Sequence, residues 1–344
     1  MMLPIIMNTA FERLAVIDDY ISFIWTTRYY TTGDFELCVD VDSRNIDTIK
    51  MDYYVCRDDD ENVGIIETIT IERNEDGQEM LIAKGRFLAS ILGRRIIAQQ
   101  TTLAGTLTVG IRKLLNENIV NPTDTDRKID NFVLSIPNVQ IGFGAQYTGK
   151  NLMDVISDIC QIYGYGFKVT LNSNHQFVFA LYSGVNRTYN QTRNPWVIFS
   201  DEYDNLLSSE YEENFQTMTN AVLVAGEGEG SERKTAWATN TGATGLNRRE
   251  TYYDQRNIRQ ETMSDTNYTN VLRQAGKEKL VGFDVAFTGR VYFDGIEYRK
   301  DVKVGDLCVI ENKRWGLYTN SRLVEVIESV NEAGEYEIVP SFGI

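Results

Sequence analysis

Apolar and polar residues alternate along much of the first hundred positions, which is the spacing of half-buried β-strands. Leu88, Ile91, Leu92 and Ile96 then keep helical spacing. The strand-like stretches are residues 15–25, 35–39, 53–55, 65–71 and 80–83, with a turn at Asn74–Gly77 between the last two. The pattern predicts β-hairpins over residues 1–98, followed by a short helix.

The pattern becomes mixed over residues 99–205. Thr106 precedes apolar residues at helical spacing, so it can cap a helix. Residues 151–163 predict a second helix, which Gly164 ends. Residues 167–171 and 177–181 alternate on either side of a polar turn, which predicts a hairpin. This middle segment is therefore expected to be an α+β domain.

Residues 206–344 return mainly to strands. A polar stretch at 231–245 predicts a long loop, and one helix is expected near 266–280, followed by Gly282. The expected strands are residues 220–225, 289–298, 306–311, 315–319, 323–330 and 336–339. Short strands at this spacing predict a small barrel or sandwich. The whole chain is thus predicted to be mainly β, with an α+β insertion.

The net charge of the chain argues against nucleic-acid binding. The 344 residues carry 34 basic and 49 acidic side chains, for a formal net charge of −15. Such a surface repels phosphate, so we expect no specific nucleic-acid binding. No apolar run is long enough to span a membrane, the first residues do not resemble a signal peptide, and no membrane insertion is expected. The scattered cysteines predict buried, reduced thiols: Cys38, Cys56, Cys160 and Cys308.

The chain offers little catalytic chemistry. His175 is the only histidine and lies beside a predicted hairpin turn, so we expect a surface residue rather than a general base. One histidine and dispersed cysteines cannot supply the usual zinc ligands. No catalytic, cofactor-binding or metal-binding residue is therefore predicted, and no cofactor. A pair of hydrolytic carboxylates stays open, because nothing marks a particular pair.

Two further motifs invite a functional interpretation. Gly226, Gly228 and Gly230 follow a strand, as in a phosphate loop, but glutamates separate them and no Lys-Ser/Thr follows. A flexible loop is expected there. The acidic run 58–61 lacks the spacing of a calcium loop and predicts a solvated turn, as do Asp124 and Asp126.

Five stretches spread along the chain form a characteristic set. The first is IDDYISFIWTTRYYTTGDFEL at residues 17–37, and the second is GRFLASILGRRII at 85–97. The others are VIFSDEYDNL at 197–206, TNAVLVAGEGEG at 219–230 and VGDLCVI at 304–310. In this order they resemble a siphophage tail-tip protein family related to the baseplate hub proteins of long-tailed phages, and the resemblance spans almost the whole chain.

The resemblance implies a non-enzymatic structural protein of a virion or phage-like particle, assembled in the bacterial host cytoplasm. Hub proteins of this kind form homotrimers, in which two small β-barrels per subunit make a ring that matches the six-fold tail tube. The barrels would be residues 1–98 and 206–344, and the 99–205 domain would lie outside or below them. The implied partners are the tube or distal tail protein above, and the spike, tape-measure end or other baseplate proteins below.

Candidate contact surfaces are the hairpin with Phe177 and Phe179, the stretch 25–30 and the loop 226–245. Each is equally compatible with ordinary core or loop structure. Two other functions stay open: a tail-associated cell-envelope hydrolase, and a carbohydrate-binding or receptor-binding module. The sequence does not distinguish contractile from flexible tails, or an infectious phage from a prophage remnant or bacteriocin-like particle.

Overall fold

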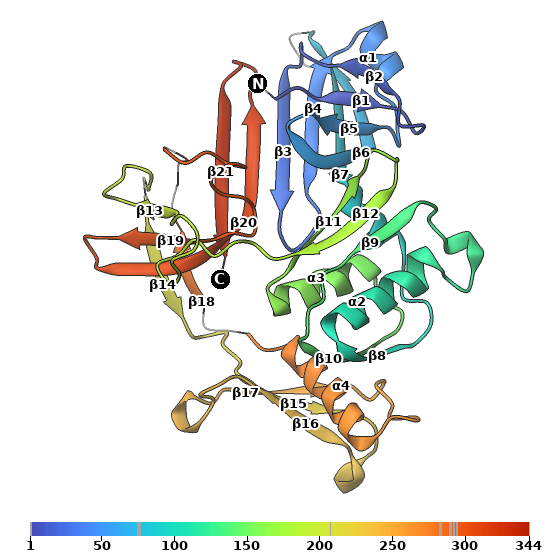
Figure 1. Cartoon of the computed structure of the whole chain (residues 1–344), viewed down its shortest axis with the longest axis vertical. Coiled ribbons are helices and arrows are strands. Elements are labelled where there is room, and N and C mark those ends of the chain that lie inside the picture. Colours follow the sequence, from blue (N-terminus) through green and yellow to red (C-terminus); the bar gives the residue numbers. More distant parts are fainter. Residues whose placement is uncertain are drawn as a thin grey trace.

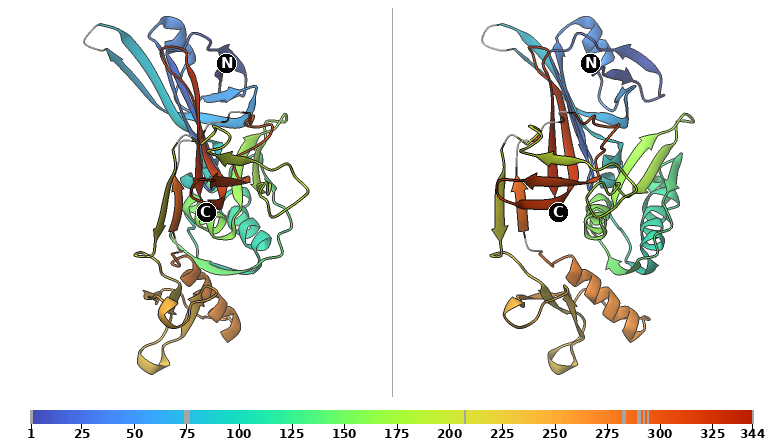
Figure 2. Two further views of the ribbon diagram at one scale, coloured as in Figure 1. Left: turned by 90° about the vertical axis from the view of Figure 1, so that its left-hand side faces the viewer. Right: turned by 60° about the vertical axis from the view of Figure 1, so that its left-hand side comes forward.

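The computed structural model of the chain describes residues 2–73, 77–206, 208–281, 284–288, 291, 293 and 295–343. Three parts follow one another along the long axis: a large sheet, an α+β segment beside its lower end, and a small sheet with one helix (Figure 1). The small unit projects from the rest of the molecule in the side views of Figure 2.

One large sheet contains both ends of the chain. Strands β20 and β3 pair antiparallel, from Glu325 opposite Arg28 to Val330 opposite Phe23. The strand order is β13 (Ile198–Ser200), β19 (Leu307–Asn312), β20 (Leu317–Val330), β3 (Ser22–Arg28), β4 (Asp34–Asp40), β7 (Glu79–Phe87), β6 (Asp60–Arg73), β5 (Tyr54–Arg57), β1 (Ile5–Met7) and β2 (Arg13–Val16), while β21 (Tyr336–Gly343) also pairs with β20. The C-terminal strands therefore extend the sheet that the N-terminal strands begin.

Alternate residues of β3 point into an aromatic core. Phe23 and Trp25 are fully buried, and the Trp25 ring centroid lies 4.5 Å from that of Phe87. Leu37 of the neighbouring strand joins the same cluster. A two-residue period sends these side chains to one face of the sheet, and burying each one contributes about 1.5–3 kcal/mol. Helix α1 (Ser43–Thr48) is the one α-helix among the described residues of this N-terminal part.

The middle segment carries the predicted helices and hairpin. Thr106 accepts a hydrogen bond from the backbone amide of Val109, and Asn151 accepts one from that of Met153 at 2.9 Å. Gly164 ends its helix at φ 71°. The elements are β8 (Thr101–Thr106), α2 (Leu107–Leu115), a π turn (Asn116–Val120), a 3-10 turn (Thr125–Arg127), β9 (Phe132–Ser135), β10 (Gly142–Tyr147), α3 (Leu152–Tyr163), β11 (Gly166–Leu171) and β12 (Phe177–Tyr182). The predicted cap at Thr106, the predicted second helix and its predicted stop at Gly164 are confirmed.

A single hydrophobic cluster joins the middle segment to the large sheet. It runs from Ile5 and Val63, on β1 and β6, through Leu88 to Ile156 and Phe179 in the middle segment. Strand β11 packs beside β6 and the 3-10 helix Leu88–Arg94. The hairpin β11–β12 is therefore held against one end of the large sheet, where the cavity described below opens.

The small sheet and its helix form a unit of residues 219–281, called the lower unit below, which is inserted into the C-terminal part of the chain. Thr219 and Val281 exchange two backbone hydrogen bonds of 3.0 Å, so the chain enters and leaves the unit at one point. Its sheet orders β16 (Thr235–Thr239), β15 (Ala221–Ala225) and β17 (Glu250–Asp254), and helix α4 (Asp265–Lys277) covers one face. Short 3-10 turns lie at Gly230–Glu232 and Gly245–Asn247, and β14 (Glu210–Asn214) pairs with β18 (Asp284–Thr288) between this unit and the large sheet.

Several predicted elements need correction. The strand expected over residues 15–25 is broken, because a bend at 19–21 separates β2 from β3. The helix expected near Leu88 is a 3-10 helix. The expected loop 231–245 contains β16, and the two strands expected at 315–319 and 323–330 are one strand, β20. The turn at 74–76, Gly282 and residues 289, 290, 292 and 294 lie outside the described residues. The described residues of the strand expected at 289–298 form a turn and isolated bridges instead of a strand.

The mainly β character of the chain is confirmed. Helix α4 lies where a helix near 266–280 is predicted. The division into two barrels, 1–98 and 206–344, around a 99–205 domain stays a prediction. No helix in the described part of the chain has the length and hydrophobicity needed to cross a membrane.

Candidate functional site

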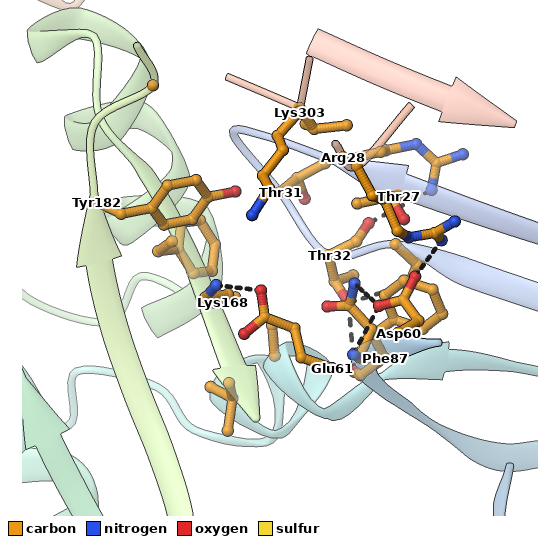
Figure 3. A pocket seen from close by; sticks show the side chains of 18 of the residues that line it. Thr27, Arg28, Thr31, Thr32, Asp60, Glu61, Phe87, Lys168, Tyr182 and Lys303 are labelled. Carbon is orange, nitrogen blue, oxygen red and sulfur yellow. Dashed lines mark hydrogen bonds and ion pairs between the residues drawn. The ribbon is translucent and has the colours of Figure 1, made fainter. Parts of the chain in front are cut away.

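A cavity of about 420 Å³ lies where the large sheet, the middle segment and the C-terminal part meet (Figure 3). Five stretches line it: the end of β3 with the turn after it, the start of β6, the end of β7 with Ala89, parts of β11 and of the chain at the end of β12, and the segment from Tyr298 to Asp306. Because its walls come from parts of the chain that are far apart in sequence, its shape depends on how those parts pack.

Tyr29 holds three of these parts together. Its side chain is fully buried, and its hydroxyl donates to the Gly164 carbonyl at 3.1 Å and accepts from the Gly184 amide at 3.2 Å. A Cβ atom on Gly305 would lie 2.3 Å from the Tyr29 ring. The side chain of Asp306, also buried, accepts from the Val185 amide at 2.7 Å. Because Gly184 and Gly305 have no Cβ atom, their backbones can pack closely against one another and against the Tyr29 ring. This packing forms one wall of the cavity.

A buried ion network forms the wall opposite the hairpin. The side chains of Arg57 and Glu328 are 1% and 2% exposed and pair with one another. Arg299 pairs with both Glu328 and Asp60, and the Trp25 indole donates to Asp60 at 3.0 Å. Buried charges are tolerated when they are paired and hydrogen-bonded in this way. The network links the N-terminal strands to β20 and to the segment before β19.

The acidic run at 58–61 begins as the exposed turn that is predicted, and Asp60 alone of its four residues has a buried side chain, 4% exposed. Each carboxylate is paired with a basic side chain: Asp58 with Arg13, Asp59 with Arg57, Asp60 with Arg299 and Glu61 with Lys168. Burial alone would raise the pKa of Asp59, but the hydrogen bond and charge of Arg57 outweigh it and the pKa is lowered. Burial would lower the pKa of Arg299, but its bond to Glu328 and the charge of Asp60 raise it. Asp59 and Arg299 therefore stay ionised near neutral pH.

A second polar junction joins the lower unit to the middle segment. The Tyr147 hydroxyl donates to Glu278 Oε1 at 2.7 Å, and the Tyr163 hydroxyl donates to Gln274 Oε1 at 2.8 Å. Burial raises the pKa of Glu278 and outweighs the Tyr147 hydrogen bond and the Lys150 charge, which lower it. The lower unit has its own hydrophobic cluster, separate from that of the middle segment. This contact therefore depends on a few polar groups.

The structure places the other predicted residues away from the cavity. His175 is exposed at the tip of the β11–β12 hairpin at φ 55°, with its ring 5.0 Å from that of Phe11. The four cysteines are buried and free, as predicted. No cluster of metal-ligating side chains occurs among the residues that the structure describes, Asp124 and Asp126 included.

The glycine motif lies in the hairpin loop between β15 and β16. Arg233 fills this loop, donating to the carbonyls of Ala225 and Gly226 at 3.0 Å and pairing with Asp254. A Cβ on Gly226 would lie 2.3 Å from the Tyr268 hydroxyl, so this glycine permits close packing on α4. The backbone of this loop is therefore contacted by its own arginine.

Two of the predicted contact surfaces are core. Phe179 and Trp25 are fully buried, and Phe177 is partly buried with its ring 5.9 Å from that of Phe11. The exposed aromatic residues include Trp196 and Tyr318, whose rings flank that of Tyr189. Strand alternation alone does not tell which face of a strand reaches solvent, and so these positions were not predicted.

The comparisons with known proteins place the chain in a family. The family described as "Siphovirus ReqiPepy6 Gp37-like protein" matches residues 3–344. The chain belongs to this family. The predicted relationship to siphophage tail proteins is confirmed, and the family places the chain in a virion or phage-like particle. No curated protein matches the chain.

Solved phage tail proteins share the fold over their whole length. A tail protein from Neisseria meningitidis MC58 is 13% identical with a TM-score of 0.60, covering 99% of this chain and 96% of that one. Prophage tail protein gp18 from Listeria monocytogenes EGD-e is 13% identical with a TM-score of 0.58, covering 98% and 94%. The 43 kDa tail protein of prophage MuSo2 from Shewanella oneidensis is 12% identical with a TM-score of 0.55, covering 99% and 97%. At these identities the likeness is one of fold.

Proposed function

We propose that this chain is a non-enzymatic hub subunit at the tail tip or baseplate of a phage or phage-like particle. Three copies form a ring that joins the six-fold tail tube to the central spike or fibre apparatus. The observation that carries the proposal is the match to a siphovirus family over residues 3–344, together with the fold of solved tail proteins. The expected partners are the tube or distal tail protein above and the spike, tape-measure end or other baseplate proteins below.

The distribution of charge supports a role beside a nucleic-acid channel. Residues 1–98, 183–218 and 282–344 carry 19 basic and 35 acidic side chains, a net charge of −16. Residues 101–182 and 219–281 carry 15 basic and 14 acidic side chains, a net charge of +1. The acidic charge is thus concentrated in the parts that build the large sheet. A channel lined by this sheet would repel passing DNA and keep it from adhering.

Labelling of intact particles tests the proposed location. Antibodies raised against this chain and coupled to gold should decorate the distal end of the tail in electron micrographs. Labelling along the shaft of the tail or at the head would refute the hub role. Antibodies against the major tube protein serve as the control, because they should mark the shaft.

A further inference from the structure

The charges that line the cavity are almost all compensated. Arg28, Lys168 and Arg299 each pair with one or more carboxylates. The lining carboxylates of Asp59, Asp60, Glu61 and Asp306 each pair with an arginine or lysine. The Lys303 ammonium is the exception: its side chain has no ion pair or hydrogen bond within the described ranges. The cavity therefore presents one uncompensated positive charge.

A second polar group faces the same space. Figure 3 shows the Tyr182 hydroxyl and the Lys303 amine turned toward one another across the cavity. No hydrogen bond of this hydroxyl occurs within the described part of the chain. Burial raises the pKa of Tyr182 far above its ordinary value, so the hydroxyl stays protonated and can donate. An ammonium and a hydroxyl donor converge there without an acceptor.

The rest of the lining limits what can bind. Val185, which is 38% exposed, and the Tyr182 ring supply accessible apolar wall, and the volume of about 420 Å³ lies within the range of about 300–1,000 Å³ typical of ligand sites. A phosphate dianion would approach Asp60 and Glu61, whose charges oppose it. A single carboxylate on a partly apolar carrier matches the Lys303 charge, which has no partner among the described residues, together with the Tyr182 hydroxyl and the apolar wall.

We propose that this cavity binds a short acidic segment of a partner protein. An aspartate or glutamate carboxylate of that segment accepts from the Lys303 ammonium and the Tyr182 hydroxyl, and its neighbours pack on Val185 and the Tyr182 ring. The bound segment contacts the large sheet, the hairpin β11–β12 and the segment 298–306 together, and so stabilises their arrangement. The inference goes beyond the hub role and does not depend on it.

Pooled peptides test the proposal without knowledge of the partner's sequence. The immobilised full chain is exposed to capped, fluorescein-labelled hexapeptides with aspartate fixed at the third position and random residues elsewhere. A matched pool carries asparagine at that position. We expect at least about tenfold greater retention of the aspartate pool, a preference equivalent to one decade in Kd. Because the chain has a net charge of −15, general electrostatics would disfavour that pool.

Two variants and one control locate the binding. Lys303→Gln and Tyr182→Phe should each reduce the preference for aspartate, with the larger loss for Lys303→Gln. Lys303 is exposed and its side chain has no partner among the residues that the structure describes, so this variant should keep the wild-type melting temperature. Lys300→Gln, three residues away and paired with Glu297 outside the cavity lining, should bind as the wild type does.

Three outcomes would overturn the proposal: equal retention of the two pools, no retention of either, or an equal loss in Lys300→Gln. None of these outcomes bears on where the chain lies in the particle. Gold labelling of the tail tip can therefore succeed while peptide binding fails, or the reverse, and the two proposals are tested separately.

Discussion

Glu328 lies between two guanidinium groups in the interior of the molecule. Its side chain is 2% exposed and pairs with both Arg57 and Arg299, and the Tyr336 hydroxyl donates to it at 3.0 Å. Removal of one partner from such a set leaves buried charges without compensation, which costs more than the original pairing contributed. At the scale of the residue, loss of the Glu328 carboxylate is therefore expected to lower the stability of the fold strongly.

We expect Glu328→Ala to lower the free energy of unfolding by about 3–5 kcal/mol, because Arg57 and Arg299 then lose their shared buried partner. Urea denaturation measures this change. Asp58→Ala is the matched control, because its pair with Arg13 has side chains 71% and 62% exposed and should contribute only about 0–1 kcal/mol. Equal losses in the two variants would show that the buried network does not stabilise the fold.

Gly184 illustrates a constraint of space rather than charge. A Cβ on this residue would lie 1.7 Å from the carbonyl oxygen of Gly305, so the cavity wall cannot form without a backbone shift. We expect Gly184→Ala to destabilise the chain by about 1–3 kcal/mol, as overpacking does elsewhere, and to weaken capture of acidic peptides. Thermal melts and the peptide assay measure the two effects.

Gly142→Ala is the control for this substitution. The φ angles of Gly142 and Gly184 both lie outside the left-handed region, but a Cβ on Gly142 would meet nothing within 4 Å. This variant should melt close to the wild type and keep its binding. If the two alanine variants behave alike, close approach at Gly184 is not what shapes the wall.

At the scale of elements, helix α4 docks on the middle segment through Glu278, the residue after its C-terminal turn. The Lys150 ammonium lies 4.0 Å from the Glu278 carboxylate, and Asp158 and Lys279 are the other charged groups that face it. Burial raises the pKa of Glu278 and of Asp158. The docked state therefore holds these protons more tightly than an undocked state does.

Docking should strengthen as the pH falls. A carboxyl whose pKa is raised in the docked state adds stability once protonated, and that contribution is lost as the pH rises through the raised pKa. We expect the protection of α4 amides against hydrogen exchange to be greater near pH 5 than near pH 8, after correction for intrinsic rates. The difference should be about tenfold for each unit by which docking raises the pKa.

Glu278→Gln imitates the neutral carboxyl, so it should be strongly protected at both pH values. Glu250→Gln, on an exposed carboxylate of β17, should keep the wild-type pH dependence. A wild-type protection that does not change with pH, or a Glu278→Gln variant that titrates as the wild type does, would contradict this assignment.

The elements that could be predicted from sequence are those with local signals. Thr106, Asn151 and Gly164 mark helix ends through contacts within a few residues, and the structure confirms each. Strand β16 was missed because its alternating Thr, Ala and Trp residues lie within a polar stretch. The break before β3 and the length of β20 depend on pairing between residues about 300 positions apart, which local patterns do not contain.

At the scale of the whole molecule, the same argument explains why the cavity could not be predicted. Its lining comes from segments between Thr27 and Asp306, and no single segment carries a motif for binding. The acidic run at 58–61 was visible in the sequence, but its basic partners, up to Arg299, were not. The family, in contrast, could be predicted, because its signature is spread in order along residues 3–344.

The most direct test of the account is a cryo-electron microscopy reconstruction of the intact particle in which this chain is located and counted. We predict three copies around the tail axis, between the tube and the central spike or fibre apparatus, with the large sheet toward the channel. Six copies, a single copy or a position away from the axis would contradict the central claim.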